Sequence, residues 1–264
     1  MALGASRSVR KTALMFSPEE REGLRDDLLA AASRDPRISG GAITGSAALD
    51  KLDRWSDIDL AFGVGDPAQI AGVLSDWTER MYGQHDAQHH MDVTAGAWIY
   101  RVFLLRNTLQ VDLAFAPAAE FGARAPSFRL VFGAAVEIPQ GAPPTPESLI
   151  GWAWLYALHA RSSIARGKLW QAEYMVSAMR DQVLALACLR HGLPARDGRG
   201  FDRLPAEVTR PLEETLIRKF DSDELQRAFA ALAGSFAAEI VRADAALGQR
   251  IRPVLAELVE SAHE

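Results

Sequence analysis

Residues 140–146, QGAPPTP, divide the sequence into two parts of different character. Three prolines in seven residues interrupt helices and central strands, so this stretch is typical of a linker. Before it, alternating apolar and polar runs are mixed with helical patterns, and after it only helical patterns follow. The sequence therefore predicts an α+β fold, with a mixed-sheet domain and flanking helices over residues 1–140 and an all-α helical bundle over residues 141–264.

The helices of the first part have clear N-terminal signals. Ser17 can cap a helix expected over residues 18–34, Pro18 suits its first turn, and Glu20 completes a capping box with Ser17. A second helix is expected over residues 66–82, because Asp-Pro opens that stretch and apolar residues recur along one side of it. These two helices are the ones we expect to flank the sheet.

Two aspartates stand at the start of a strand expected over residues 57–64, DIDLAFGV. Side chains two positions apart in a strand point the same way and lie about 6–7 Å apart, so Asp57 and Asp59 share a face. Ile58 and Leu60 then point into the core. Two carboxylates held this close repel each other, and a divalent cation such as Mg²⁺ between them relieves the repulsion.

Two further features strengthen the case for a metal–phosphate site. Asp112 lies in LQVDLAF, an alternating strand in which an acid is otherwise costly. If this strand pairs beside the first, three carboxylates share one surface and can hold two metal ions. Upstream, Gly45 and Ser46 form a turn after a short strand, and such turns expose backbone N–H groups and a hydroxyl to phosphate oxygens.

Together, Gly45-Ser46, the WSDIDL segment and Asp112 resemble the polymerase-β-like nucleotidyltransferase superfamily over residues 38–116. Within it, the two-part layout is similar to antibiotic-modifying members such as the lincosamide and kanamycin nucleotidyltransferases, which pair a catalytic domain with a C-terminal bundle. Residues 165–186 are similar to the long bundle helix of the lincosamide enzymes, a looser resemblance.

The resemblance implies Mg²⁺-dependent transfer of a nucleoside monophosphate, AMP from ATP or the equivalent from another NTP. The acceptor would be a hydroxyl of a small molecule, with aminoglycosides and lincosamides as candidates, and pyrophosphate would leave. Asp57 and Asp59 would bind Mg²⁺ and position the triphosphate. Asp112 would hold the second metal ion or accept the hydroxyl proton.

The resemblance also implies a general base in the bundle. In kanamycin-modifying relatives a glutamate on a bundle helix takes this role, and Glu173 is the corresponding candidate here. Lys168, about one turn earlier, is a candidate for contact with a phosphate. A solvated helix face is the alternative interpretation of both residues.

The chain departs from its relatives on the phosphate side of the motif. Many relatives carry an Arg-Gly pair after the Gly-Ser, where this chain has Leu49 and Asp50. Arg54 or Lys51 would then have to supply the missing positive charge. Arg54 and Ser56, just before the paired aspartates, are therefore included among the expected nucleotide contacts.

Charge and composition exclude several partners. The net charge of −5 gives no basic surface for a long nucleic acid. No run reaches the about 18 consecutive apolar residues of a membrane span, and the N-terminus lacks the pattern of a signal peptide, so we expect a soluble, cytoplasmic protein. The one cysteine, Cys188, is expected in the core. A homodimer is one assembly to expect, because relatives often line one cleft with two subunits.

Residues 85–92, HDAQHHMD, suggest zinc, but their spacing fits no ordinary ligand pattern, and we expect a polar loop. Three other functions stay open beside transfer to a small molecule. The acceptor could be a protein side chain, as in toxin–antitoxin or regulatory nucleotidyltransferases. An RNA-cutting bundle fused to an inactive domain is disfavoured, since His191 follows Arg180 by eleven residues, too far for the motif of such bundles. A non-enzymatic binding module is the third.

Overall fold

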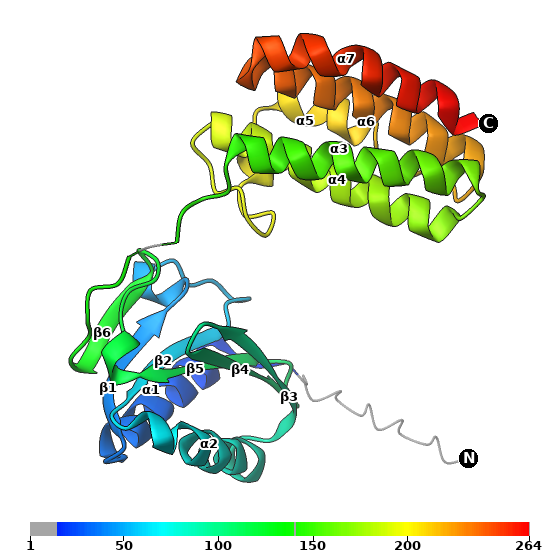
Figure 1. Ribbon diagram of the computed structural model, residues 1–264. Coiled ribbons are helices and arrows are strands. Elements are labelled where there is room, and N and C mark those ends of the chain that lie inside the picture. The colour runs from blue at the N-terminus through cyan, green and yellow to red at the C-terminus, as the bar shows by residue number, and fades with distance from the viewer. Residues whose placement is uncertain (1–14, 140, 264) are drawn as a thin grey trace, which may run out of the picture. The chain divides into compact units, whose positions relative to one another are not determined.

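The protein is described here by a computed structural model that covers residues 15–139 and 141–263. These residues form two compact units that divide between Gly141 and Ala142 (Figure 1). The first unit is a mixed sheet with helices and the second is entirely helical, which confirms the predicted α+β class. Within the described ranges no helix is both long and apolar enough to cross a membrane.

The sheet of the first unit has six strands in the order β3-β4-β5-β2-β1-β6. β2 and β5 are parallel neighbours at its centre, and the other neighbouring pairs are antiparallel. The elements are α1 (Pro18–Arg34), β1 (Ile38–Thr44), β2 (Ile58–Val64), α2 (Ile70–Gln84), β3 (Ala87–Ala95), β4 (Trp98–Leu105), β5 (Gln110–Pro117) and β6 (Phe128–Gly133).

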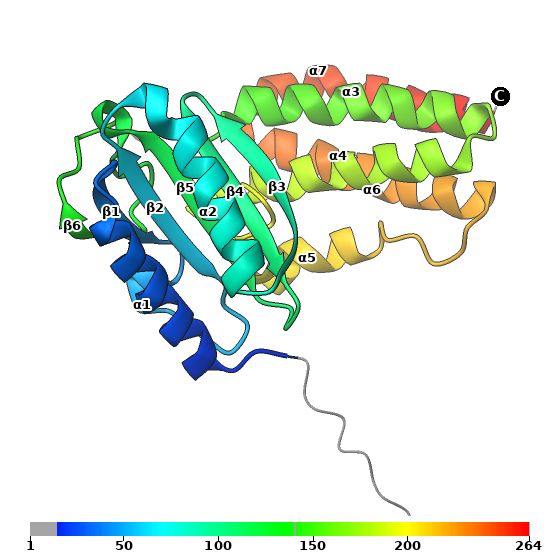
Figure 2. The same ribbon diagram turned by 90° about the horizontal axis from the view of Figure 1, so that it is seen from below.

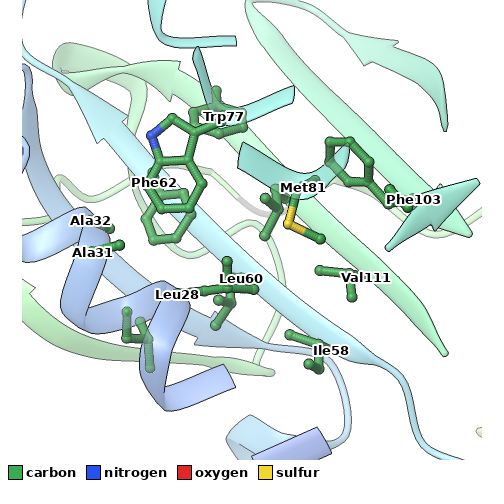
Figure 3. Close-up of a cluster of buried hydrophobic side chains, with 14 of the residues drawn as sticks. Leu28, Ala31, Ala32, Ile58, Leu60, Phe62, Trp77, Met81, Phe103 and Val111 are labelled. Carbon is green, nitrogen blue, oxygen red and sulfur yellow. The ribbon is translucent and has the colours of Figure 1, made fainter. Parts of the chain in front are cut away.

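Both helices of this unit lie across one face of the sheet (Figure 2). α1 has the predicted bounds and capping box: the Glu20 backbone N–H donates to Ser17 Oγ at 3.2 Å, and the Ser17 N–H donates to Glu20 Oε2 at 2.8 Å. The apolar side chains of β2 meet Leu28 and Trp77 of the helices, as Figure 3 shows. Each large side chain buried in this core contributes roughly 1.5–3 kcal/mol of transfer free energy.

The opposite face of the sheet carries small residues along its central strands. Ala61 of β2 and Ala114 of β5 are buried there under the aromatic rings of Trp98 and Phe121. Phe121 comes from the segment after β5, and its ring lies close to the backbone of Gly63. The aromatic cover leaves the start of β2, where Asp57 and Asp59 stand, half-buried and accessible.

The expectation of a polar loop over residues 85–92 was wrong. Most of this stretch belongs to β3, an edge strand that pairs with β4 from Ala87 to Ala95. The strand is largely exposed on both sides, so its sequence lacks the apolar alternation by which strands are predicted. His90 accepts or donates a hydrogen bond with the Tyr82 hydroxyl at 3.0 Å, an ordinary surface contact.

The second unit is a bundle of helices around a large apolar core, with a smaller apolar cluster that contains Cys188. Its helices are α3 (Pro146–Ala165), α4 (Leu169–Arg190), α5 (Ala206–Glu213), α6 (Ser222–Ala243) and α7 (Ala245–Glu260). Thr145 caps α3 through Ser148, at the end of the proline-rich stretch. Cys188 is fully buried and unpaired, as expected for a small core residue.

Candidate active site

The two central strands bring the predicted acids together. β2 and β5 are parallel, and their register sets Asp59 directly opposite Asp112. Adjacent strands lie about 4.8 Å apart, so the two carboxylates are neighbours on one face. Asp57 stands one position before Ile58 and, by the alternation of a strand, projects toward the same face.

Asp57 has a partner that the sequence did not predict. Gln110, the first residue of β5, donates a hydrogen bond from Nε2 to Asp57 Oδ2 at 3.2 Å. The two residues are 53 positions apart in the chain, so only the pairing of β2 with β5 brings them together. Gln110 therefore holds one oxygen of Asp57 on the acidic face.

Asp112 is an acid of this face whose surroundings disfavour its charged form. Its Oδ1 atom is buried and has no hydrogen-bond partner among the described residues. Burial, and then the negative charge of Asp57, raise the pKa of Asp112 from 3.8 to about 6. An unpartnered carboxylate oxygen at this place is stabilised either by a proton or by a cation.

Asp112→Asn is expected to stabilise the protein at pH 8 in the absence of divalent cations, by roughly 1–3 kcal/mol. Because the folded-state pKa is raised, the folded state binds more protons between pH 3.8 and about 6, and stability falls as pH rises through that window. Asparagine escapes this loss since it cannot ionise. Denaturant unfolding at pH 8 and at pH 4 measures the difference, which should shrink toward pH 4.

The matched control is expected to change the stability at pH 8 in the opposite direction. Asp92→Asn on β3 should lose stability at pH 8, because the Arg101 guanidinium holds the pKa of Asp92 below its ordinary value through paired hydrogen bonds. If Asp112→Asn were no more stable than the wild type at pH 8, the description of Asp112 as a buried, unsatisfied charge would be wrong.

Gly45 lies against the carboxylate of Asp59. Its φ is +63°, a conformation that favours glycine, and a Cβ placed there would stand 1.9 Å from Asp59 Oδ2. Ser46 comes next and is followed by a single 3-10 turn, Ala47–Leu49. The Ser46 side chain does not cap this turn. A turn of this length has no significant helix dipole. A ligand would therefore be bound by its backbone N–H groups and by the Ser46 hydroxyl.

The acidic face is not a preformed metal cage. Across residues 15–139 and 141–263, no three His, Cys, Asp or Glu side chains are close enough together to hold a metal ion. One oxygen of Asp57 accepts a hydrogen bond from Gln110. The donor set nevertheless fits Mg²⁺, since it consists of hard carboxylate oxygens and includes the unpartnered Oδ1 of Asp112.

The turn before Asp57 is held by its own side chains. Ser56 Oγ accepts from the Asp53 N–H at 2.9 Å and donates to Asp53 Oδ1 at 3.0 Å. The Arg54 guanidinium lies 5.6 Å from the centre of the exposed Trp55 ring and contacts Met15 Sδ. The Ser56 hydroxyl is thus engaged within the turn, and the expected nucleotide contacts of Arg54 and Ser56 stay predictions.

The two candidates of the second unit lie at the start of α4. Glu173 Oε1 accepts a hydrogen bond from Ser177 Oγ at 2.6 Å, and Arg180 donates to the same hydroxyl at 3.3 Å. Arg180 also donates to Thr215 Oγ1 at 2.6 Å, which ties α4 to the segment after α5. Glu173 is therefore a half-buried member of a network, whereas Lys168 is exposed. Their proposed roles stay predictions.

No family model and no curated protein sequence matches the chain. Among solved structures it is similar to an aminoglycoside 6-adenyltransferase from Bacillus subtilis, with 13% identity and a TM-score of 0.39. That likeness covers 92% of this chain and 99% of the other. A likeness this remote assigns neither an activity nor a substrate to the chain.

Proposed function

We propose that the chain is a nucleotidyltransferase that transfers a nucleoside monophosphate, AMP from ATP, to a hydroxyl of a small molecule with the help of Mg²⁺. One observation carries the proposal: Asp59 and Asp112 face each other on adjacent parallel strands, with Asp57 beside them and a glycine turn against Asp59. Aspartates on neighbouring strands beside such a turn suit a metal-bound triphosphate.

In this proposal, some residues of the acidic face bind the metal and others bind the phosphates. Asp57 and Asp59 would hold Mg²⁺, and Asp112 would hold a second ion or accept the proton of the acceptor hydroxyl. The bound ion would neutralise the charge of the triphosphate and of the leaving pyrophosphate. The backbone N–H groups and the hydroxyl of the Gly45-Ser46 turn would donate to phosphate oxygens. Catalysis would come mainly from positioning and from electrostatic complementarity.

The reaction itself needs little covalent chemistry from the protein. The acceptor oxygen attacks the α-phosphorus, the bond between that phosphorus and the bridging oxygen breaks, and pyrophosphate leaves with the electron pair. The acceptor proton passes to a carboxylate. Asp112 is one candidate for this role, in place of holding a second metal ion, and Glu173 is the other.

A screen of hydroxyl-bearing acceptors tests the proposed function. Purified protein is incubated with radiolabelled ATP, Mg²⁺ and a panel of small molecules that includes aminoglycosides and lincosamides, and any product is measured by mass spectrometry. The expected result is an acceptor carrying one AMP group, formed by the wild type and absent with chelator. ATP consumption that needs no divalent cation, or no transfer to any acceptor, would contradict the proposal.

Glu173→Gln separates the two candidate bases. If Glu173 is the base, kcat should fall about 10²-fold with the KM for ATP unchanged, because only proton removal is lost. Glu147→Gln, in the first turn of α3, is the matched control and should keep the wild-type kcat. A wild-type kcat in Glu173→Gln would exclude it as the base and leave Asp112 in that role.

A further inference from the structure

Arg21 breaks two rules that usually govern arginine. It lies in the first turn of α1, near the helix end where positive charge is disfavoured. Arg21 is only 3% exposed, and a buried guanidinium loses its hydration. Neither helix formation nor solubility explains an arginine at this position, so its contacts must.

Those contacts go to the turn that precedes Asp57. Arg21 Nη1 donates to the backbone oxygen of Asp53 at 2.5 Å and to that of Ser56 at 3.2 Å. Its ion pair with the neighbouring Glu22 is long, at 3.7 Å, and that carboxylate is half-exposed. One nitrogen of the buried guanidinium, Nη1, therefore binds two backbone carbonyls, 32 and 35 positions away in the chain.

The second of these carbonyls is in the peptide group that leads into Asp57. A peptide unit is planar, so the oxygen of Ser56 and the N and Cα atoms of Asp57 lie in one plane. A donor fixed on that oxygen fixes the orientation of this peptide plane and of the N–Cα bond of Asp57, and so restricts the directions in which the Asp57 side chain can leave the backbone. Gln110 then holds the carboxylate itself, through Oδ2.

We propose that Arg21 is a positioning residue that orients Asp57 toward the metal side of the acidic face, an inference that rests on the proposed function. It acts through the 53–56 turn and touches neither metal nor nucleotide. Removing a group that orients a metal ligand in this way typically weakens metal binding by about 10–100-fold.

The test compares Arg21→Met and Arg21→Gln with Arg25→Met. Arg25 lies one turn later on α1 and pairs with its neighbour Asp26, so its loss leaves the turn untouched. The first readout is hydrogen exchange of the amides of residues 53–57, three of which donate bonds inside the turn. The second is Mn²⁺ binding to the nucleotide-free protein, followed by electron paramagnetic resonance.

Arg21→Met is expected to raise exchange in the 53–57 segment about tenfold and to weaken Mn²⁺ binding about tenfold, with α1 and the sheet still protected. Arg25→Met should change neither. Wild-type exchange and Mn²⁺ affinity in folded Arg21→Met would overturn the inference. If Arg21→Met does not fold, Arg21→Gln decides, because its side chain is uncharged and shorter: raised exchange with weakened Mn²⁺ binding supports the role, and wild-type values exclude it. A wild type that binds no Mn²⁺ contradicts the proposed function and the inference together, whereas unchanged exchange contradicts the role of Arg21 alone.

Discussion

Asp59→Asn is expected to reduce Mg²⁺-dependent nucleotide transfer by about 10³-fold or more while the protein keeps its fold. Asp59 stands opposite Asp112 on adjacent strands, so its carboxylate is the central member of the acidic face. Asparagine has nearly the same shape but removes the charge that a metal ion requires. Asp57→Asn should have the same effect. Initial rates with saturating ATP and Mg²⁺, together with circular dichroism, measure both halves of this expectation.

Asp76→Asn is the control for this loss of charge. Asp76 lies on α2, across the sheet from the acidic face, and pairs with Arg37 at 2.7 Å at an exposed place. Exposed ion pairs contribute about 0–1 kcal/mol, so this variant should keep near-normal activity. Turnover of Asp57→Asn or Asp59→Asn within about tenfold of the wild type would count against any metal role for these acids.

Gly45→Ala is the second large expected effect. The added methyl group would stand 1.9 Å from Asp59 Oδ2, so either the turn or the carboxylate must move. The positive φ adds roughly 1–2 kcal/mol of backbone strain for alanine. We expect a loss of stability of about that size and a loss of transfer activity comparable to that of Asp59→Asn. Thermal unfolding and initial rates measure the two effects.

Gly23→Ala is the matched glycine control. Gly23 lies inside α1, and a Cβ there meets nothing within 4 Å. Alanine is a better helix former than glycine by about 1 kcal/mol, so this variant should be slightly more stable and fully active. If Gly45→Ala behaved like Gly23→Ala, the close approach of the turn to Asp59 would have no functional meaning.

Much of this arrangement could be predicted because it depends on local patterns. The capping box at Ser17 and Glu20 is read within four residues, and α1 begins where it indicates. The strand period of two places Asp57 and Asp59 on the same face without any knowledge of neighbouring strands. The position of Asp112 required one further assumption, that β5 pairs beside β2, and the register supports it.

The remaining parts of the site depend on contacts between distant segments. Gln110 reaches Asp57 across 53 positions, and Arg21 reaches Asp53 across 32. Gln110 does not stand out in the sequence, since a glutamine at a strand start is ordinary. A signal for Arg21 did exist, because a cation in the first helical turn opposes the helix dipole. β3 was missed since an exposed edge strand needs no apolar alternation.

Calorimetric titration with a non-hydrolysable ATP analogue tests the central claim most directly. The titration is run on the wild type with Mg²⁺, on the wild type with chelator, and on Asp59→Asn with Mg²⁺. The account predicts saturable binding in the first case and binding at least about tenfold weaker in the other two. Equal affinity with and without the cation, or no binding by the wild type when Mg²⁺ is present, would contradict it.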